Sequence, residues 1–145
     1  METIKNILVP VDGSEISNKA LDYASEIGKK FGAEVTVLHV YELPIPITGF
    51  EYSAEILANI DEELKKHAQK ILDNSANKIE HNGLTVKKLM LVGNQGYLIV
   101  DTAEKNKFDL IIMGSRGLGF TKGFLLGSVS NYVIHHTKHS VLLVH

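Results

Sequence analysis

Short apolar runs alternate with longer segments of helical periodicity along this chain of 145 residues, and this alternation restricts its fold more than any other feature. Strands are expected where apolar and β-branched residues cluster, over residues 4–11, 34–41, 85–92, 109–113 and 140–144. Between them, apolar residues recur every three or four positions, which indicates helices. Strands that alternate with helices predict an α/β fold, with a five-stranded parallel sheet and helices on both faces. Right-handed crossovers leave only a few doubly wound strand orders.

The expected helices have recognisable ends and core-facing stripes. Ser14 is a good N-cap for the first helix and Gly32 ends it. A longer helix follows the proline-containing stretch 43–49, which cannot itself be helical, and it stops at residues 81–83. The stripe of the first helix contains Ala20, Leu21, Ala24, Ile27, Gly28 and Phe31. That of the second contains Ile56, Leu57, Ile60, Leu64, Ala68, Ile71, Leu72, Ser75 and Ile79.

Length, charge and residue usage narrow the class of protein. A chain of this size can bury one good core, so we expect a single domain over residues 1–145. A net charge of −2, with Lys and Arg spread along the chain, argues against a nucleic-acid or membrane-surface partner. The lack of cysteine excludes disulfides and thiolate metal sites. No apolar run approaches the roughly 18 residues of a membrane span, and no signal-peptide layout opens the chain, so we expect a cytoplasmic protein.

A glycine-rich stretch connects the strand at 109–113 to a helix expected at 129–136. It contains Arg116 and Lys122 but no acidic residue, and its glycines are Gly114, Gly117, Gly119, Gly123 and Gly127. Glycine lets a ligand approach the backbone closely, and a helix N-terminus offers unpaired N–H groups and the positive end of the helix dipole. A flexible connection would explain one glycine better than five. The stretch therefore favours a phosphate site, with ATP as the expected ligand.

Two well-known nucleotide fingerprints do not fit this stretch. GxxxxGK[ST] does not occur, which excludes a Walker-type NTPase. Gly117-Leu118-Gly119 begins like GxGxxG, but Lys122 stands at the third glycine position. The stretch also follows the fourth strand, whereas a Rossmann loop follows the first. NAD is therefore not the expected ligand.

The turn Asp12-Gly13-Ser14 after the first strand has two interpretations. Asp12 either stabilises the first turn of the helix through its dipole, or binds ribose hydroxyls or a Mg²⁺ held by phosphates. The residues alone favour neither. Asp12 and Gly114 both follow the carboxyl ends of strands, where ligands bind in such sheets, and this proximity favours the second interpretation.

Two other features stay open. The segment 42–52 is long for a connection without regular structure. It either covers a bound base with Ile45, Ile47 and Phe50 or is a surface excursion. His39, inside the second strand, is expected to be a satisfied core or pocket-edge group and not a catalyst.

The spacing Gly-x2-Gly-x9-Gly-Ser, which ends at Gly127-Ser128, resembles that of the ATP-binding branch of the universal stress protein family. The resemblance covers the whole chain. It begins with residues 7–14 (ILVPVDGS), continues through 109–117 and closes with 127–133 and 141–144. His139-Ser140 departs from the family, which often has a proline there, and this affects only the local loop.

The resemblance implies an open sheet in the strand order 3-2-1-4-5. It also implies a homodimer in which the last strands of two subunits, Val141–Val144, pair antiparallel. ATP and Mg²⁺ are the implied ligands, with Asp12 meeting the Mg²⁺ indirectly. The base and ribose would be bordered by Pro10, Val11, Asp12, Val40, Met113 and Gly114, and the phosphates by Arg116, Gly117, Gly127, Ser128, Val129 and Ser130.

Three functions agree with these residues. The first is an ATP-binding regulatory or stress-response protein, in which backbone N–H groups and the hydroxyls of Ser128 and Ser130 hold the phosphates. The alternative is a slow ATPase or phosphotransfer enzyme, for which the glycine stretch offers no evident base, and we assign no catalytic residue. The third is a dimeric interaction module without nucleotide turnover. We expect Gly127→Val to abolish ATP binding and leave the fold intact.

Overall fold

The computed structural model describes residues 3–44, 52–117 and 126–145. The segments 45–51 and 118–125 lie outside the described residues. They include the three apolar residues considered as a cover for a base, Ile45, Ile47 and Phe50. They also include Gly119, Lys122 and Gly123 of the glycine-rich stretch.

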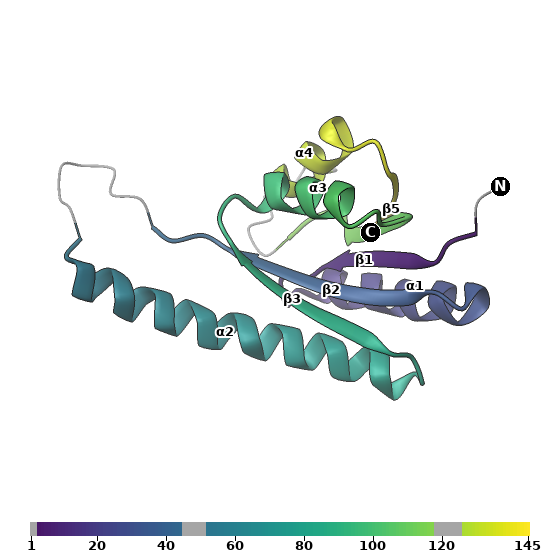
Figure 1. Cartoon of the computed structure of the whole chain (residues 1–145), viewed down its shortest axis with the longest axis horizontal. Helices are drawn as coiled ribbons and strands as arrows, with labels where there is room; N and C mark the ends of the chain where they lie inside the picture. The colour runs from purple at the N-terminus through teal and green to yellow at the C-terminus, as the bar shows by residue number, and fades with distance from the viewer. Residues whose placement is uncertain (1–2, 45–51, 118–125) are drawn as a thin grey trace.

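Five parallel strands form one sheet in the order β3-β2-β1-β4-β5. The strands are β1 (Asn6–Pro10), β2 (Glu34–Tyr41), β3 (Val86–Val92), β4 (Leu110–Gly114) and β5 (Ser140–Val144). The helices are α1 (Glu15–Phe31), α2 (Ala54–His81), α3 (Gln95–Lys105) and α4 (Ser128–His136). Figure 1 shows α1 and α2 on one face of the sheet, and α3 and α4 on the other. The expected α/β fold and strand order are confirmed.

The three central strands are buried on both faces, so each contributes to two cores. Alternate residues of β1 point to opposite faces of the sheet. Ile7 and Val9 belong to the core under α1 and α2, and Leu8 belongs to the core under α3 and α4. In β2, Val37 likewise belongs to the first core and Leu38 to the second. This two-sided burial explains why these strands appear in the sequence as continuous apolar runs.

Local capping fixes where α1 begins and ends. The Ser14 hydroxyl accepts a hydrogen bond from the Ser17 amide at 3.1 Å. Gly32 ends the helix with a φ of 66°, a left-handed conformation that glycine adopts without steric cost. Both ends agree with the sequence prediction because caps depend on a few neighbouring residues.

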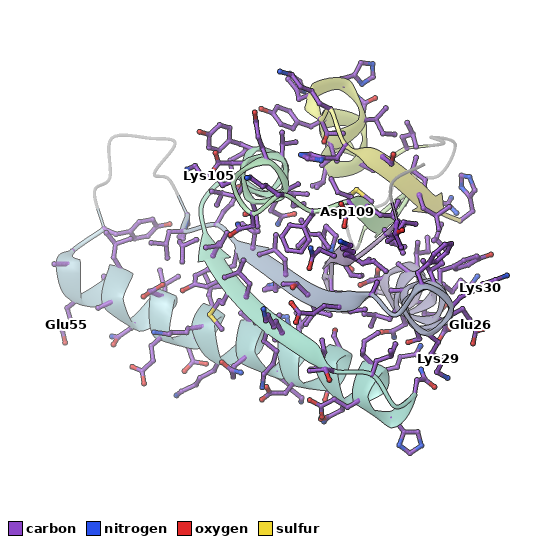
Figure 2. All side chains as sticks on the ribbon, turned by 45° about the vertical axis from the view of Figure 1, so that its right-hand side comes forward. Glu26, Lys29, Lys30, Glu55, Lys105 and Asp109 are labelled. Carbon is purple, nitrogen blue, oxygen red and sulfur yellow. The ribbon has the colours of Figure 1, made fainter. Side chains whose placement is uncertain are left out.

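The core-facing stripes are longer in the sequence than in the structure. Phe31, the last residue of α1, is 40% exposed, and Ile56 in α2 is 47% exposed. The 28 residues of α2 span about 42 Å at 1.5 Å per residue. The 8 residues of β2 span only about 26 Å. The first turns of α2 therefore extend past the carboxyl edge of the sheet, as Figure 1 shows, and Figure 2 places Glu55 at this projecting end.

The two edge strands differ in charge. On β3, Lys87 pairs with Glu34 at 2.8 Å and Lys88 pairs with Asp73 at 3.0 Å. Hydrogen bonds from Lys88 and Gln69 lower the pKa of the Asp73 carboxyl. β5, at the other edge, contains no charged residue. Charged side chains discourage pairing with another chain, so β5 is the better edge for such pairing.

Among the helices in the described part of the chain, none is both long and apolar enough to cross a bilayer.

Replacing Ile79 by Ala should lower the free energy of unfolding by about 2–5 kcal/mol, because it leaves a cavity in the core. Ile79 is fully buried in α2. Ile56→Ala is the same change on the projecting end of the same helix, and should alter that free energy by less than about 0.5 kcal/mol. Urea unfolding followed by circular dichroism measures both. Equal losses would show that the projecting turns are covered in solution.

Candidate functional site

The carboxyl ends of β1, β2 and β4 border a cleft of about 1110 Å³. It lies at the point where the order of the strands reverses, the usual place for a ligand in an open α/β sheet. Every one of the twelve residues implied by the family resemblance lines it: Pro10, Val11, Asp12, Val40, Met113, Gly114, Arg116, Gly117, Gly127, Ser128, Val129 and Ser130. The fold thus brings four separate segments of the chain together, and their role toward a ligand stays a prediction.

The loop between β1 and α1 holds Asp12 in place through its own backbone. Asp12 Oδ1 accepts a hydrogen bond from the Ser14 amide at 2.9 Å, and the Asp12 amide donates to Ser17 Oγ at 3.3 Å. Gly13 has a φ of 84°, and a Cβ there would lie 3.4 Å from Cγ1 of Ile71 in α2. The carboxylate of Asp12 therefore takes part in the turn and also lines the cleft. The two interpretations of this residue are compatible.

His39 joins the end of β2 to the same loop. Its Nδ1 donates to the Val11 carbonyl oxygen at 2.7 Å, which requires the tautomer with a proton on Nδ1. The Val11 amide donates to the Leu38 carbonyl oxygen at 2.8 Å. His39 is 8% exposed and lines the cleft. It is thus a buried, hydrogen-bonded group at the wall of the cleft, as the sequence suggested.

Tyr41 connects the end of β2 to α2. Its hydroxyl donates to Asp61 Oδ1 at 2.7 Å. This hydrogen bond, with burial, raises the pKa of the Tyr41 hydroxyl. Tyr41 lines the cleft together with Leu64, His67 and Ile71 of α2. No local motif marks the pairing of Tyr41 with Asp61, because the two residues are 20 positions apart.

The connection from β4 to α4 is centred on Ser115. The Ser115 amide donates to the Val144 carbonyl oxygen at 2.8 Å, and its own carbonyl oxygen accepts from the Gly127 amide at 2.7 Å. Ser130 Oγ also donates toward that carbonyl, at 2.6 Å, and lies 3.1 Å from the Gly127 carbonyl oxygen. His145 Nδ1 lies 3.1 Å from Ser115 Oγ. Ser115 is completely buried. The sequence pattern marked the glycines on either side of it and not this serine.

This geometry changes the role expected of the Ser130 hydroxyl. A serine hydroxyl has one proton, and here it is directed to backbone carbonyl oxygens. A phosphate oxygen needs a donor, and in this arrangement the Ser130 hydroxyl proton supports the loop instead. Ser128 is exposed at the start of α4, and its hydroxyl remains suited to a ligand.

The glycines of the site lie close to other atoms of the protein itself. A Cβ at Gly114 would lie 2.5 Å from Cγ2 of Ile16, and one at Gly117 would lie 2.6 Å from Oδ2 of Asp12. A Cβ at Gly127 would lie 3.3 Å from the Arg116 Cα. A side chain at position 127 would therefore require the Arg116 backbone to shift. That Gly127→Val leaves the fold intact stays a prediction, and part of any effect on ATP binding would come from this shift.

The remaining wall contains polar groups near the start of α3. The Gln95 amide donates to Glu42 Oε1 at 3.3 Å, and both residues line the cleft. Ile99 and Met113, on the α3 and α4 side, supply apolar surface. Within residues 3–44, 52–117 and 126–145, no three His, Asp or Glu side chains are grouped so that they could hold a metal ion.

Comparison with known proteins agrees with this architecture. The model of the universal stress protein family matches residues 3–145. The chain is 35% identical over 143 residues to the universal stress protein YxiE of Bacillus subtilis, with 95% of this chain and 97% of that protein covered.

Two solved structures share the fold. One is MJ0577 of Methanocaldococcus jannaschii, at 32% identity and a TM-score of 0.86, with 99% of this chain and 96% of that chain covered. The other is a universal stress protein in complex with cAMP, at 26% identity and a TM-score of 0.72, with 99% and 97% covered. Because the family model matches nearly the whole of this chain, the chain belongs to the universal stress protein family.

Proposed function

We propose that this protein binds an adenine nucleotide, ATP with Mg²⁺, and acts as a nucleotide-dependent regulatory module in a stress response. The observation that carries the proposal is the convergence of twelve residues from four chain segments on one cleft at the reversal of strand order. The similar protein solved in complex with cAMP supports an adenine nucleotide as the ligand class.

The start of α4 is suited to the phosphates. Its N-cap is Gly127, which has no side chain to cap the amides of the first turn. Such amides and the positive end of the helix dipole attract anions. Ser128 and Gly117 both line the cleft. The apolar surface of Val40 and Met113 would receive the base.

Asp12 is the residue of the cleft that would hold Mg²⁺ together with the phosphates. This ion is usually held by one or two carboxylates together with substrate phosphates, and it keeps several waters. Asp12 provides a carboxylate on the wall of the cleft, and its Oδ1 is oriented by the Ser14 amide. When bound, the ion would neutralise part of the charge of the phosphates.

The proposal includes a homodimer formed through β5 and a cytoplasmic location without nucleic-acid or membrane partners. β5 is an uncharged edge strand. Because the Ser115 amide bonds to the Val144 carbonyl, the peptide groups of Ser140, Leu142 and Val144 face β4. Those of Val141 and Leu143 face the open edge, where a second copy would pair.

Calorimetric titration of the nucleotide-stripped protein with ATP and Mg²⁺ should give saturable binding near one ATP per chain. Asp12→Asn keeps an oxygen acceptor for the Ser14 amide but removes the charge, so it should weaken binding of Mg-ATP by about tenfold. Binding of metal-free ATP should not weaken in this variant. No saturable binding by the wild-type protein would overturn the proposal and leave an interaction module.

Ser128 and Ser130 form a matched pair that separates phosphate contact from support of the loop. Ser128→Ala should weaken ATP binding by about tenfold, the effect of losing one hydrogen bond to a charged group, without changing stability. Ser130→Ala should lower the free energy of unfolding by about 1 kcal/mol, because the buried Ser115 carbonyl loses its hydroxyl donor. Calorimetry and urea unfolding test both. An unchanged affinity in Ser128→Ala would contradict this assignment.

Val141→Pro should convert the proposed dimer into a folded monomer, because it removes an amide that faces the open edge of β5. Leu142→Pro is the matched control: it removes an amide that faces β4 and should destabilise the fold itself. Sedimentation equilibrium gives the molecular weight, and circular dichroism reports folding. A wild-type protein that sediments as a monomer would refute pairing through β5.

A further inference from the structure

The hydrogen bonds at the end of β1 break the pattern of the parallel ladder. β1 and β2 pair in register up to Pro10 and Leu38, and the Val11 amide still donates to the Leu38 carbonyl oxygen. In a parallel ladder, the next bond would run from the Val40 amide to the Val11 carbonyl oxygen. Here the Val11 carbonyl oxygen instead accepts a hydrogen bond from His39 Nδ1, at 2.7 Å.

This substitution has a consequence for Val40. Peptide groups alternate along a strand, so those of Leu38 and Val40 face β1, and that of His39 faces β3. The Val40 N–H and C=O are therefore directed toward the point where β1 has ended. Val40 lines the cleft there, at its apolar wall.

We propose that His39 is a positioning residue that keeps the backbone edge of Val40 available to a ligand. By donating to the Val11 carbonyl, it prevents β1 and β2 from pairing one residue further. The exposed edge presents a donor beside an acceptor. Adenine matches it with a ring-nitrogen acceptor beside an amino donor, whereas hypoxanthine presents the reverse pattern. This selectivity rests on the proposed nucleotide function; the arrangement of the backbone does not.

Two substitutions isolate the hydrogen bond. His39→Leu fills a similar space without a donor, so the Val11 carbonyl should capture the Val40 amide. His39→Asn places an amide N–H at the position of Nδ1 and should preserve the native arrangement. Both variants keep a side chain at a site that is 8% exposed.

Amide hydrogen exchange in the nucleotide-free protein, measured by NMR, tests the arrangement directly. In the wild-type protein and in His39→Asn, the Val40 amide should exchange at least tenfold faster than the Leu38 amide, which belongs to the ladder. In His39→Leu, the Val40 amide should become protected. A protected Val40 amide in the nucleotide-free wild-type protein overturns the inference without any variant. So do equal Val40 exchange rates in the wild-type protein and a folded His39→Leu.

Titration with ATP and ITP tests the consequence for the ligand. The wild-type protein and His39→Asn should prefer ATP by about twofold to tenfold, the value of one hydrogen bond, and His39→Leu should lose this preference. If Val40 behaves as expected in exchange but neither nucleotide binds, the proposed function fails and the positioning role of His39 stands. If ATP binds and His39→Leu keeps the full preference, the selectivity assigned to His39 is wrong.

Discussion

Where the ladder between two parallel strands stops, a backbone carbonyl is left outside it, and a buried carbonyl must find another donor. This constraint operates twice at the carboxyl edge of the sheet. After β1, the Val11 amide still bonds to Leu38 while its carbonyl turns to His39. After β4, the Ser115 amide still bonds to Val144 while its carbonyl turns to Gly127 and Ser130. The two strands separate from their neighbours at the same level, and the cleft is the space between the loops that follow.

Because the cleft is a product of strand endings, the residues that shape it also maintain the fold. Gly117 lies against the end of the Asp12 side chain, and Gly127 lies against the backbone of Arg116. Either glycine would also admit a phosphate. A side chain at either position would require a neighbouring group of the loops to shift, whereas the exposed Ser128 can be altered without disturbing a contact of the loop.

Much of the fold could be predicted from the sequence because its signals are local. Ser14 and Gly32 mark α1 through neighbours a few residues away, and two-sided burial gives the central strands their apolar runs. The strand order and the twelve cleft residues came through the family resemblance. The bonds from His39 to Val11 and from Tyr41 to Asp61 could not be predicted, since each joins residues at least 20 positions apart. The overhang of α2 depends on comparing the lengths of a helix and a strand that periodicity alone treats separately.

The anchoring of this edge bears on how a ligand would bind. The loop after β1 is fixed by Ser14, Ser17 and His39 and by its packing on Ile71. Because all of these contacts lie within the protein, the ordering of this segment is a cost of folding and not of association, which leaves more of the interaction energy for affinity. A nucleotide would meet donors of fixed direction at Val40 and at the start of α4. Discrimination among nucleotides would then depend on how well their own donors and acceptors match that fixed set.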